Sequence, residues 1–296
     1  MPKPKLYDCF CFFNEEMLLQ LRMDTLWDHV DYFVISEANY THKGHPRKTV
    51  FDISKFEKYK SKIRYQVLEK KPAGANEFWK NENFIRNNIT SGLYDSKPED
   101  LILISDLDEI PNPKKISSYN PKFLRGDFLQ NYYSYYLNNL WVKDPSARDT
   151  ENLSGVIWKG TKITTIEHFN HFFRANATSV RHYKSSGPLR SLKRAWFNTH
   201  QVQNIEQGGW HFTWVLSLDD IIKKMDSTAH TFDDPKFRDK SFLEKTIHAN
   251  RDFQDPNKHY VTLKIDSSFP EPMRNNQARY NEFLMPQKPN SDSGYR

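Results

Sequence analysis

The chain has 296 residues, of which 37% are hydrophobic and 27% charged, and it carries a net charge of +6. This length is enough to bury a core as one large domain or two small ones, and the hydrophobic content excludes a disordered chain. The positive charge favours anionic ligands without naming one. Because no zinc-finger, basic-zipper or RNA-recognition motif is present, we expect no nucleic-acid partner.

Targeting signals are not found. The apolar run near the N-terminus is too short for a signal peptide, and no run reaches transmembrane length. We therefore expect a soluble, cytoplasmic protein without a transmembrane segment. Cys9 and Cys11 fall on the same face of a predicted strand and are interpreted as reduced core residues. The sequence indicates no oligomeric state.

The first part of the chain alternates between strand and helix patterns. Apolar runs predict strands at 6–13, 32–36, 63–68 and 101–104. Asn14 is the expected N-cap of the first helix. A helix is predicted from about 80 to 93, with a buried side formed by Phe84, Ile85, Asn88, Ile89 and Gly92. This alternation predicts an α/β, doubly wound sheet through about residue 118.

The second part of the chain has a different pattern. Aromatic alternation over 128–141 and 156–173 predicts long antiparallel strands, and helical spacing returns at 218–225 and 242–249. The segment from Pro270 is rich in Pro, Asn and Ser and is expected to be irregular. No linker divides the chain. We therefore expect one domain over 1–270, with halves of about 6–118 and 119–270, and an irregular C-terminal segment at 271–296.

The strongest local signal is a pair of acids, Asp106 and Asp108, directly after the strand predicted at 101–104. In open α/β sheets, ligands bind outside the carboxyl ends of the strands. Divalent cations such as Mg²⁺ and Mn²⁺ prefer oxygen ligands and often bind one or two carboxylates together with substrate phosphates. The pair is therefore a candidate metal site, although acids also end strands as turns and helix caps.

Several segments together resemble glycosyltransferase family 17. The segments that carry the resemblance are 7–10, 13–15, 34–39, Trp79, Glu82, Arg86, the motif Asp106-Leu107-Asp108-Glu109-Ile110-Pro111, and Gly209-Trp210-His211-Phe212. Asp219, Lys224, Ser227 and His230 fall where bacterial-type members carry an acid, a lysine, a serine and a histidine. The resemblance covers about residues 6 to 232 and is loose over 120–205.

The resemblance implies a GT-A type fold. This fold has a Rossmann-like, mostly parallel sheet with helices on both faces for the nucleotide sugar, and a smaller mixed acceptor-side subregion. It also implies an inverting hexosyl- or pentosyltransferase that uses Mn²⁺ or Mg²⁺ and a UDP-sugar. The donor would be UDP-N-acetylglucosamine, or another such as UDP-xylose, and the acceptor a glycan hydroxyl. We expect the chain to depart from the family in having no counterpart of the membrane anchor of the animal Golgi members. It also has Val215-Leu216-Ser217 where bacterial-type relatives are rich in glycine.

The resemblance assigns candidate roles at the metal site. Asp108, with Asp106 directly or through water, would hold the metal against the donor pyrophosphate and so assist the leaving group. His211 would be a further metal ligand or would contact the pyrophosphate. It could instead be a half-buried histidine satisfied by the backbone. Asp219 is the first candidate for the base that takes the acceptor proton, and Glu109 is the second. An acid at the position of Asp219 is also favoured simply as a helix cap.

Four further side chains are candidate contacts for the donor. Glu37 would bind uridine or ribose, or would cap the loop that follows it. Arg86 would reach the donor phosphate or organise the Asp-x-Asp loop, or would form an ordinary ion pair on its helix. Lys224 and His230 would contact phosphate, although a lysine on a helix is most often solvated. The basic run from 181 to 194 is interpreted as a surface loop rather than a lid.

Two other functions are alternatives to sugar transfer. A phosphatase of the haloacid-dehalogenase type also places Asp-x-Asp after a strand, but there the motif lies near the start of the chain, and a Thr or Val stands where this chain has Ile110. Release of phosphate from an aryl phosphate would support it. A non-catalytic carbohydrate-binding protein would account for the aromatic content but has no need of paired carboxylates. Sugar binding indifferent to metal and nucleotide would support that alternative.

Overall fold

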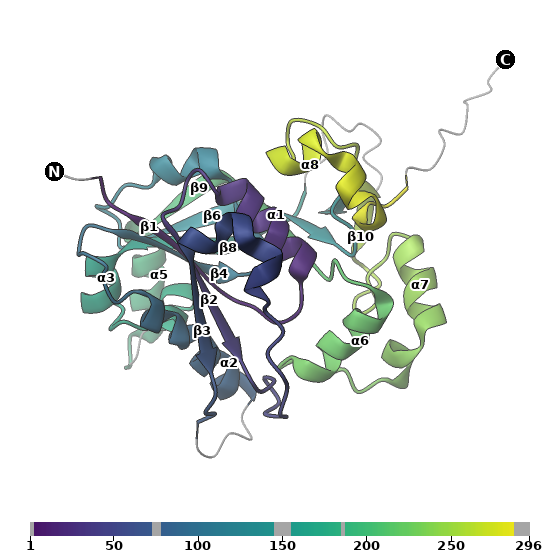
Figure 1. The fold of residues 1–296 in the computed structure, drawn as a ribbon, viewed down its shortest axis with the longest axis horizontal. Helices are drawn as coiled ribbons and strands as arrows, with labels where there is room; N and C mark the ends of the chain where they lie inside the picture. Colours follow the sequence, from purple (N-terminus) through teal and green to yellow (C-terminus); the bar gives the residue numbers. More distant parts are fainter. Residues whose placement is uncertain (1–2, 73–77, 145–154, 185–186, 287–296) are drawn as a thin grey trace.

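A computed structural model describes residues 3–72, 78–144, 155–184 and 187–286. Within these residues one mixed sheet has the strand order β10-β7-β6-β8-β4-β1-β2-β3, and β9 joins it beside β6 and carries β5 (Figure 1). The strands are β1 Leu6–Cys11, β2 Tyr32–Ala38, β3 Ile63–Leu68, β4 Leu101–Asp106, β5 Glu109–Pro111, β6 Arg125–Ser134, β7 Asn139–Val142, β8 Ile157–Thr165, β9 Val202–Thr213 and β10 His259–Thr262. The α-helices are α1 Glu16–Leu26, α2 Phe78–Asn87, α3 Ile166–His171, α4 Ala177–Arg181, α5 Arg190–His200, α6 Leu218–Ser227, α7 Lys240–His248 and α8 Glu271–Asn275.

The strands β4, β1, β2 and β3 are mutually parallel, at the four positions predicted from apolar runs. Alternate side chains of β1 enter different cores. Leu6 and Phe10 pack with α1, the 3₁₀ segment η1 (Ile53–Lys62) and the C-terminal helices, while Tyr7 and Cys9 pack with α3, α4 and α5. Helices therefore cover both faces of this part of the sheet, which explains why its strands are continuously apolar.

The rest of the sheet is largely antiparallel. Among the described residues, five of the nine strand pairings are antiparallel, so the α/β class is confirmed but the sheet as a whole is mixed rather than mostly parallel. The strand predicted over 156–173 ends at Thr165, because the hydroxyl of Thr165 accepts a hydrogen bond from the amide of His168 and starts α3. β9 runs parallel to β6, which the alternation of residues could not reveal.

Three local predictions were wrong. α1 begins at Glu16 with Glu15 as its N-cap, so Asn14 does not cap it. The prediction for the second helix is wrong only in part: Ile85, Ile89 and Gly92 are buried as predicted, but the α-helix ends at Asn87, residues Asn88–Gly92 form the 3₁₀ segment η2, and Phe84 is 42% exposed. The segment expected to be irregular forms α8 and the 3₁₀ segment η6 (Gln277–Phe283), while residues 287–296 lie outside the described residues.

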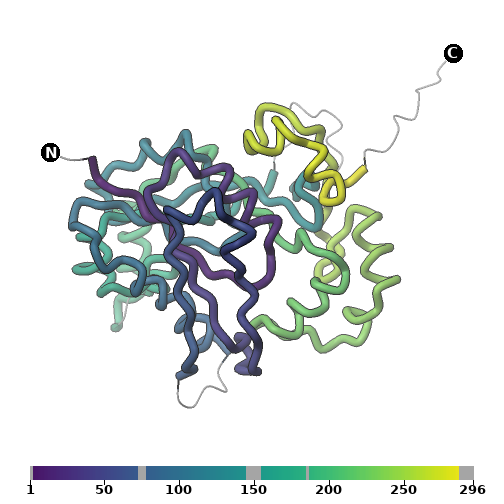
Figure 2. Tube along the Cα trace, viewed as in Figure 1, coloured from purple at the N-terminus to yellow at the C-terminus, as the bar shows by residue number. Residues whose placement is uncertain are grey.

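The C-terminal segment closes the core beside α1. Met273 and Tyr280 are buried in the same apolar cluster as Leu18 and Leu21 of α1. Figure 2 shows this segment, in yellow, above the green chain of α6 and α7. Helices of the described ranges are all too short or too polar to cross a lipid bilayer.

Candidate active site

The Asp-x-Asp motif forms the turn between β4 and β5, at the carboxyl end of the parallel strands. β4 ends at Asp106 and β5 begins at Glu109. β5 pairs with β9 so that Glu109 lies opposite His211, and the amide of Phe212 donates to the carbonyl oxygen of Asp108 at 2.8 Å. This pairing brings the Gly-Trp-His segment, about a hundred residues later in the chain, against the motif.

A fully buried arginine fixes the backbone of this turn from below. Arg22 of α1 forms a bidentate ion pair with Asp8 of β1, at 2.6 and 2.7 Å. Its guanidinium also donates to the Ser105 hydroxyl and to the carbonyl oxygens of Asp106, Leu107 and Glu109, at 2.6 to 3.2 Å. The turn is therefore held in one conformation by charge-assisted hydrogen bonds in a buried setting.

The carboxylate of Asp106 is held by two arginines. Arg86 of α2 donates to Oδ1 at 3.1 Å and Arg181 of α4 donates to Oδ2 at 2.9 Å. Burial alone would raise the pKa of Asp106, but the two guanidinium groups hold that pKa well below its usual range. Arg86 also pairs with Glu82 at 2.7 Å. The contacts of Arg86 therefore match two of its predicted roles, the organisation of the Asp-x-Asp loop and the ion pair with Glu82.

Glu109 is buried and its oxygens are already engaged. They accept hydrogen bonds from Arg181 at 2.8 Å, from the Trp158 indole at 2.7 Å and from the amide of Asp106 at 3.0 Å. Burial opposes its ionisation, yet Arg181 lowers the pKa of Glu109 below its usual value. A carboxylate held in this way supports the turn rather than accepting a proton from a substrate.

Asp108 is the less engaged of the two motif acids. Its Oδ1 lies 3.6 Å from Nε2 of His211 and its Oδ2 lies 3.9 Å from Nζ of Lys224. Burial raises the pKa of Asp108, and His211 and Lys224 oppose that rise. His211 stacks on Trp158 with ring centroids 5.0 Å apart, and its Nδ1 is buried without a hydrogen-bond partner among the described residues.

These groups line a cavity of about 430 Å³. Its wall combines the end of β1, α2, the motif turn, β6, β8, β9 and α6. The predicted site residues that line it are Arg86, Asp106, Asp108, Glu109, His211, Lys224 and His230. Lys224 pairs with Glu15 at 3.0 Å, and the ring of His230 meets Trp79 edge to face at 5.0 Å. The fold thus brings seven predicted residues from distant parts of the chain into one cavity.

Two predicted site residues lie outside this wall. Glu37 is buried and accepts hydrogen bonds from Arg47, from the Tyr65 hydroxyl and from the amides of Val50 and Phe51, which matches the alternative of a loop cap. Asp219 lies in the first turn of α6, where an acid is favoured. Its side chain is 64% exposed and pairs with Lys240 at 2.6 Å, so the fold does not bring it to the motif.

The side chains of Asp108 and His211 fit a cation whose remaining coordination positions are filled by a bound ligand. Within the described ranges no group of three or more His, Cys, Asp or Glu side chains could hold a metal ion alone. Asp108 and His211 supply a carboxylate and an imidazole side by side, and Nδ1 of His211 has no hydrogen-bond partner within the described ranges. Carboxylates suit Mn²⁺ and Mg²⁺, and substrate phosphates commonly complete such sites.

Sequence reasoning missed three supporting residues. The sequence predicts a surface loop at Arg181, but this side chain is buried against Asp106 and Glu109. Trp158 joins Glu109 to His211, and Arg22 holds the turn. One signal was available for Arg22: Asp8 is an acid inside an apolar strand, and a buried carboxylate needs a partner. No local signal distinguishes Arg181 from its exposed neighbours.

Comparison with known proteins confirms the resemblance. Residues 1–146 match the model of glycosyltransferase family 17. The chain is 35% identical over 252 residues to a human protein named beta-1,4-mannosyl-glycoprotein 4-beta-N-acetylglucosaminyltransferase, and 26% identical to the protein of that name from Rattus norvegicus. Each match covers 76% of this chain and 43% of the relative, so the chain spans less than half the length of these relatives.

Solved structures show only a weak likeness. The glycosyltransferase GlyE of Streptococcus pneumoniae TIGR4 in its apo form shares 11% identity, with a TM-score of 0.30, over 70% of this chain and 46% of that chain. A second GlyE structure shares 12% identity with the same TM-score, over 97% of this chain and 66% of that chain. Scores this low carry no argument about the fold or the function.

Proposed function

We propose that this protein transfers a sugar from a nucleotide diphosphate donor to a hydroxyl of a glycan acceptor, on the premise that residues 1–146 match the model of glycosyltransferase family 17. One observation carries the proposal most directly. Asp108 and His211 face each other in a cavity at the carboxyl ends of the parallel strands, where ligands of open α/β sheets bind.

The proposed cofactor is Mn²⁺ or Mg²⁺, held by Asp108 and His211, with Asp106 contributing through water. When bound, such an ion neutralises the negative charge that develops on the departing nucleotide diphosphate. The protein's part is to keep the two ligands in position. Arg22 and the β5–β9 pairing hold the motif turn. Arg86 and Arg181 pair with Asp106, which keeps this carboxylate ionised and fixed in position beside Asp108.

Cationic side chains support the placement of the donor diphosphate in this cavity. Burial works against the charge of Lys224, but Glu15 and Asp108 raise the pKa of its ammonium group above the usual value, so it is positive at neutral pH. His230 lines the same wall and is positioned against Trp79. A diphosphate bound between Lys224 and the Asp108 side would face positive charge in a water-poor site, where such contacts are strongest.

Uridine is the proposed base of the donor and inversion the proposed stereochemical course, both on the family resemblance. The relatives' names specify N-acetylglucosaminyl transfer, so UDP-N-acetylglucosamine is the first donor to test, followed by UDP-xylose. The acceptor base is not assigned to Asp219, because that carboxylate faces Lys240 at the surface. We do not assign the base to Glu109 either, because the oxygens of that carboxylate are engaged by Arg181 and Trp158.

The proposal is tested by thermal unfolding with UDP, with Mn²⁺ and with both, followed by turnover of a panel of UDP-sugars. A ligand that binds only the folded state raises stability by mass action, by about 2.7 kcal/mol at a hundred times its Kd. We expect a large stabilisation only when UDP and Mn²⁺ are combined, and turnover of one UDP-sugar. The proton NMR spectrum of the product reports whether the anomeric centre is inverted.

Asp108→Asn should abolish the joint stabilisation while Asp219→Asn, a matched substitution at a surface acid, should retain it. Equal responses of the two variants would contradict the metal site. No response of the wild-type protein to any nucleotide would contradict the transferase proposal. Phosphate release from an aryl phosphate, or sugar binding indifferent to nucleotide and metal, would then support the phosphatase or the binding protein instead.

A further inference from the structure

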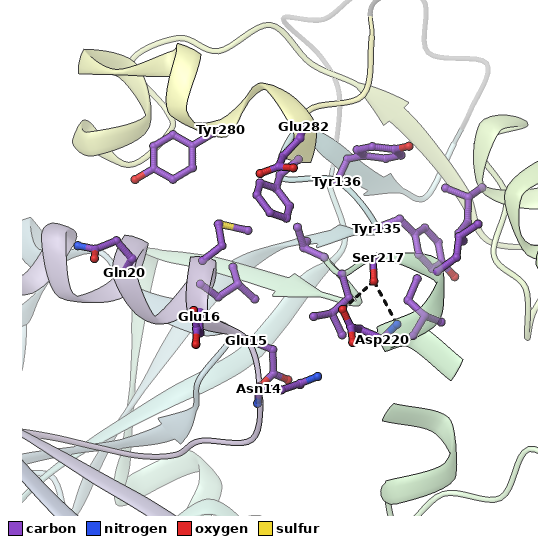
Figure 3. A pocket seen from close by; sticks show the side chains of 18 of the residues that line it. Asn14, Glu15, Glu16, Gln20, Tyr135, Tyr136, Ser217, Asp220, Tyr280 and Glu282 are labelled. Carbon is purple, nitrogen blue, oxygen red and sulfur yellow. Dashed lines mark hydrogen bonds between the residues drawn. The ribbon is translucent and has the colours of Figure 1, made fainter. Parts of the chain in front are cut away.

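A second, larger cavity of about 790 Å³ lies next to the donor cavity. Its walls are the start of α1, η1, the chain leading into α6, the face of α7 and the C-terminal residues 279–283. Figure 3 shows Tyr280 and Glu282 of the C-terminal segment across the opening from Gln20 and Glu16 of α1. Tyr135 and Tyr136, which follow β6, complete the wall, so it is built from six separate parts of the chain. We refer to this cavity as the outer cleft.

Aromatic rings and carboxylates dominate the outer cleft. The rings come from Phe56, Tyr135, Tyr136, Tyr280 and Phe283, and the carboxylates from Glu15, Glu16, Asp220, Glu244 and Glu282. Phe56, Tyr135 and Tyr280 are buried, so the rings that are open to a ligand are those of Tyr136 and Phe283. Flat aromatic faces offer apolar contact to sugar rings, and carboxylates accept hydrogen bonds from hydroxyl groups. This mixture, with a small number of polar groups among apolar ones, is typical of binding sites for small polar ligands.

The charges of the outer cleft select against anions. Five acids stand against two bases, Lys55 and Arg279, in a protein whose net charge is +6. Lys55 is already paired with Glu16 at 2.6 Å, and Arg279 lies 3.5 Å from Asp24. An anionic ligand would therefore meet carboxylates such as Glu244 and Glu282, which form no ion pair with any described residue. A nucleotide diphosphate is better accommodated by the donor cavity, beside Lys224.

The two cavities meet at one buried carboxylate. Glu15 lines both of them, and its side chain is only 8% exposed. Nζ of Lys224 lies 3.0 Å from Glu15 and 3.9 Å from Asp108. A single ammonium group therefore links Glu15, at the boundary between the two cavities, to the Asp-x-Asp motif. Burial opposes the ionisation of Glu15, but Lys224 lowers its pKa below the usual value, so the carboxylate is an acceptor at neutral pH.

We propose that the outer cleft binds the acceptor as an uncharged saccharide, with the carboxylate of Glu15 accepting a hydrogen bond from the hydroxyl that enters the donor cavity. This inference rests on the proposed transferase function. It adds the chemical class of the acceptor and the surface that holds it. Tyr136, half-buried in the wall with its hydroxyl 3.4 Å from Nε2 of His248, is the proposed stacking ring.

Binding is tested by ligand-observed NMR with two matched probes, chitotriose as the neutral trisaccharide and trigalacturonate as the anionic one. We expect the wild-type protein to bind chitotriose and not trigalacturonate. Tyr136→Ala should weaken chitotriose binding by about tenfold or more, because truncating a stacked aromatic ring removes a dominant contact. Tyr94→Ala is the matched control, since Tyr94 is 76% exposed and lines neither cavity.

The double charge reversal Glu244→Lys and Glu282→Lys changes two exposed side chains of the rim and should allow trigalacturonate to bind. Glu15→Gln should retain stabilisation by UDP with Mn²⁺ but lower the turnover of the transfer. Chitotriose binding that is unchanged in Tyr136→Ala, no binding of chitotriose, or preference of the wild-type protein for trigalacturonate would overturn the inference. Retained stabilisation by UDP with Mn²⁺ separates such a failure from a failure of the transferase proposal.

Discussion

The two halves of the sheet contribute to the site in different ways. The parallel half, β4-β1-β2-β3, ends in the motif turn and fixes its backbone through Arg22 and Asp8. The antiparallel half brings groups that face the motif carboxylates: His211 from β9, Trp158 from β8 and, through the connection that follows β8, Arg181. The parallel half therefore anchors the backbone of the turn, and the antiparallel half supplies most of the side chains that face the carboxylates, with Arg86 of α2 as a further partner of Asp106.

This difference predicts that damage to the parallel half acts mainly on folding. Arg22→Met leaves Asp8 as a buried charge without its partner, which should destabilise the protein by about 3–5 kcal/mol. Urea unfolding followed by circular dichroism measures the change. The double variant Asp8→Leu, Arg22→Met removes both charges and should recover much of that loss. A single variant as stable as wild type would show that this pair does not anchor the turn.

Damage to the antiparallel half should instead act on activity. Arg181→Lys keeps the charge but cannot donate to Asp106 and Glu109 together, so the motif carboxylate loses part of its support. Loss of a group that orients a metal site typically costs 10–100-fold in affinity or activity, and we expect about that reduction in kcat/KM. Arg194→Lys, an exposed residue of the same basic run, is the control. Equal activity of both variants would contradict the assignment of Arg181.

The antiparallel half also contains a buried lysine with a predicted effect on stability. Lys162 of β8 lies 3.3 Å from Asp127, and burial lowers the pKa of its ammonium group to about 8. The unfolded chain keeps that proton until about pH 10.4. Between pH 8 and 10 the Lys162 side chain therefore binds more protons in the unfolded state, and its contribution to the free energy of unfolding should rise with pH in that window. The buried thiols of Cys9 and Cys11, whose pKa values are raised by burial, act in the opposite direction, so the effect of Lys162 is measured as a difference between variants.

The size of this rise follows from the pKa difference. It should reach about 1.5 kcal/mol between pH 8 and 9.5, because the group is already half deprotonated at pH 8 and one pKa unit corresponds to about 1.36 kcal/mol. Urea unfolding at the two pH values should show it as a change in the difference between wild type and Lys162→Met, while Lys159→Met, whose side chain is exposed, should follow wild type. Identical pH dependence in the two variants would contradict the prediction.

The smallest effect is expected at Asp219. Its carboxylate is exposed and pairs only with Lys240 among the described residues, and exposed pairs contribute little. Asp219→Asn should change the free energy of unfolding by less than about 0.5 kcal/mol and leave turnover near that of wild type. Loss of transfer with retained UDP binding would restore Asp219 as the base and would mean that α6 moves towards the motif during the reaction.

The sequence could predict the parts of the molecule that depend on local pattern. The four parallel strands follow from continuous apolar runs, and Asp106 and Asp108 follow from their place after one of them. Glu109 lies opposite His211 because β5 pairs with β9, about a hundred residues later in the chain. The periodicity of apolar residues along the sequence does not reveal such a long-range strand pairing. The sequence could not show that Asp219 pairs with Lys240 away from the motif, because a position in a motif does not say which way a helix turns its first residues.

Binding of Mn²⁺ in the presence of UDP, followed by electron paramagnetic resonance, tests the central claim most directly. The signal of free Mn²⁺ falls as the ion is bound. We expect UDP and the wild-type protein together to reduce that signal, and Asp219→Asn to behave in the same way. Asp108→Asn should leave the signal close to that of UDP and Mn²⁺ without protein. Equal binding by Asp108→Asn and wild type would contradict the assignment of the motif as the metal site.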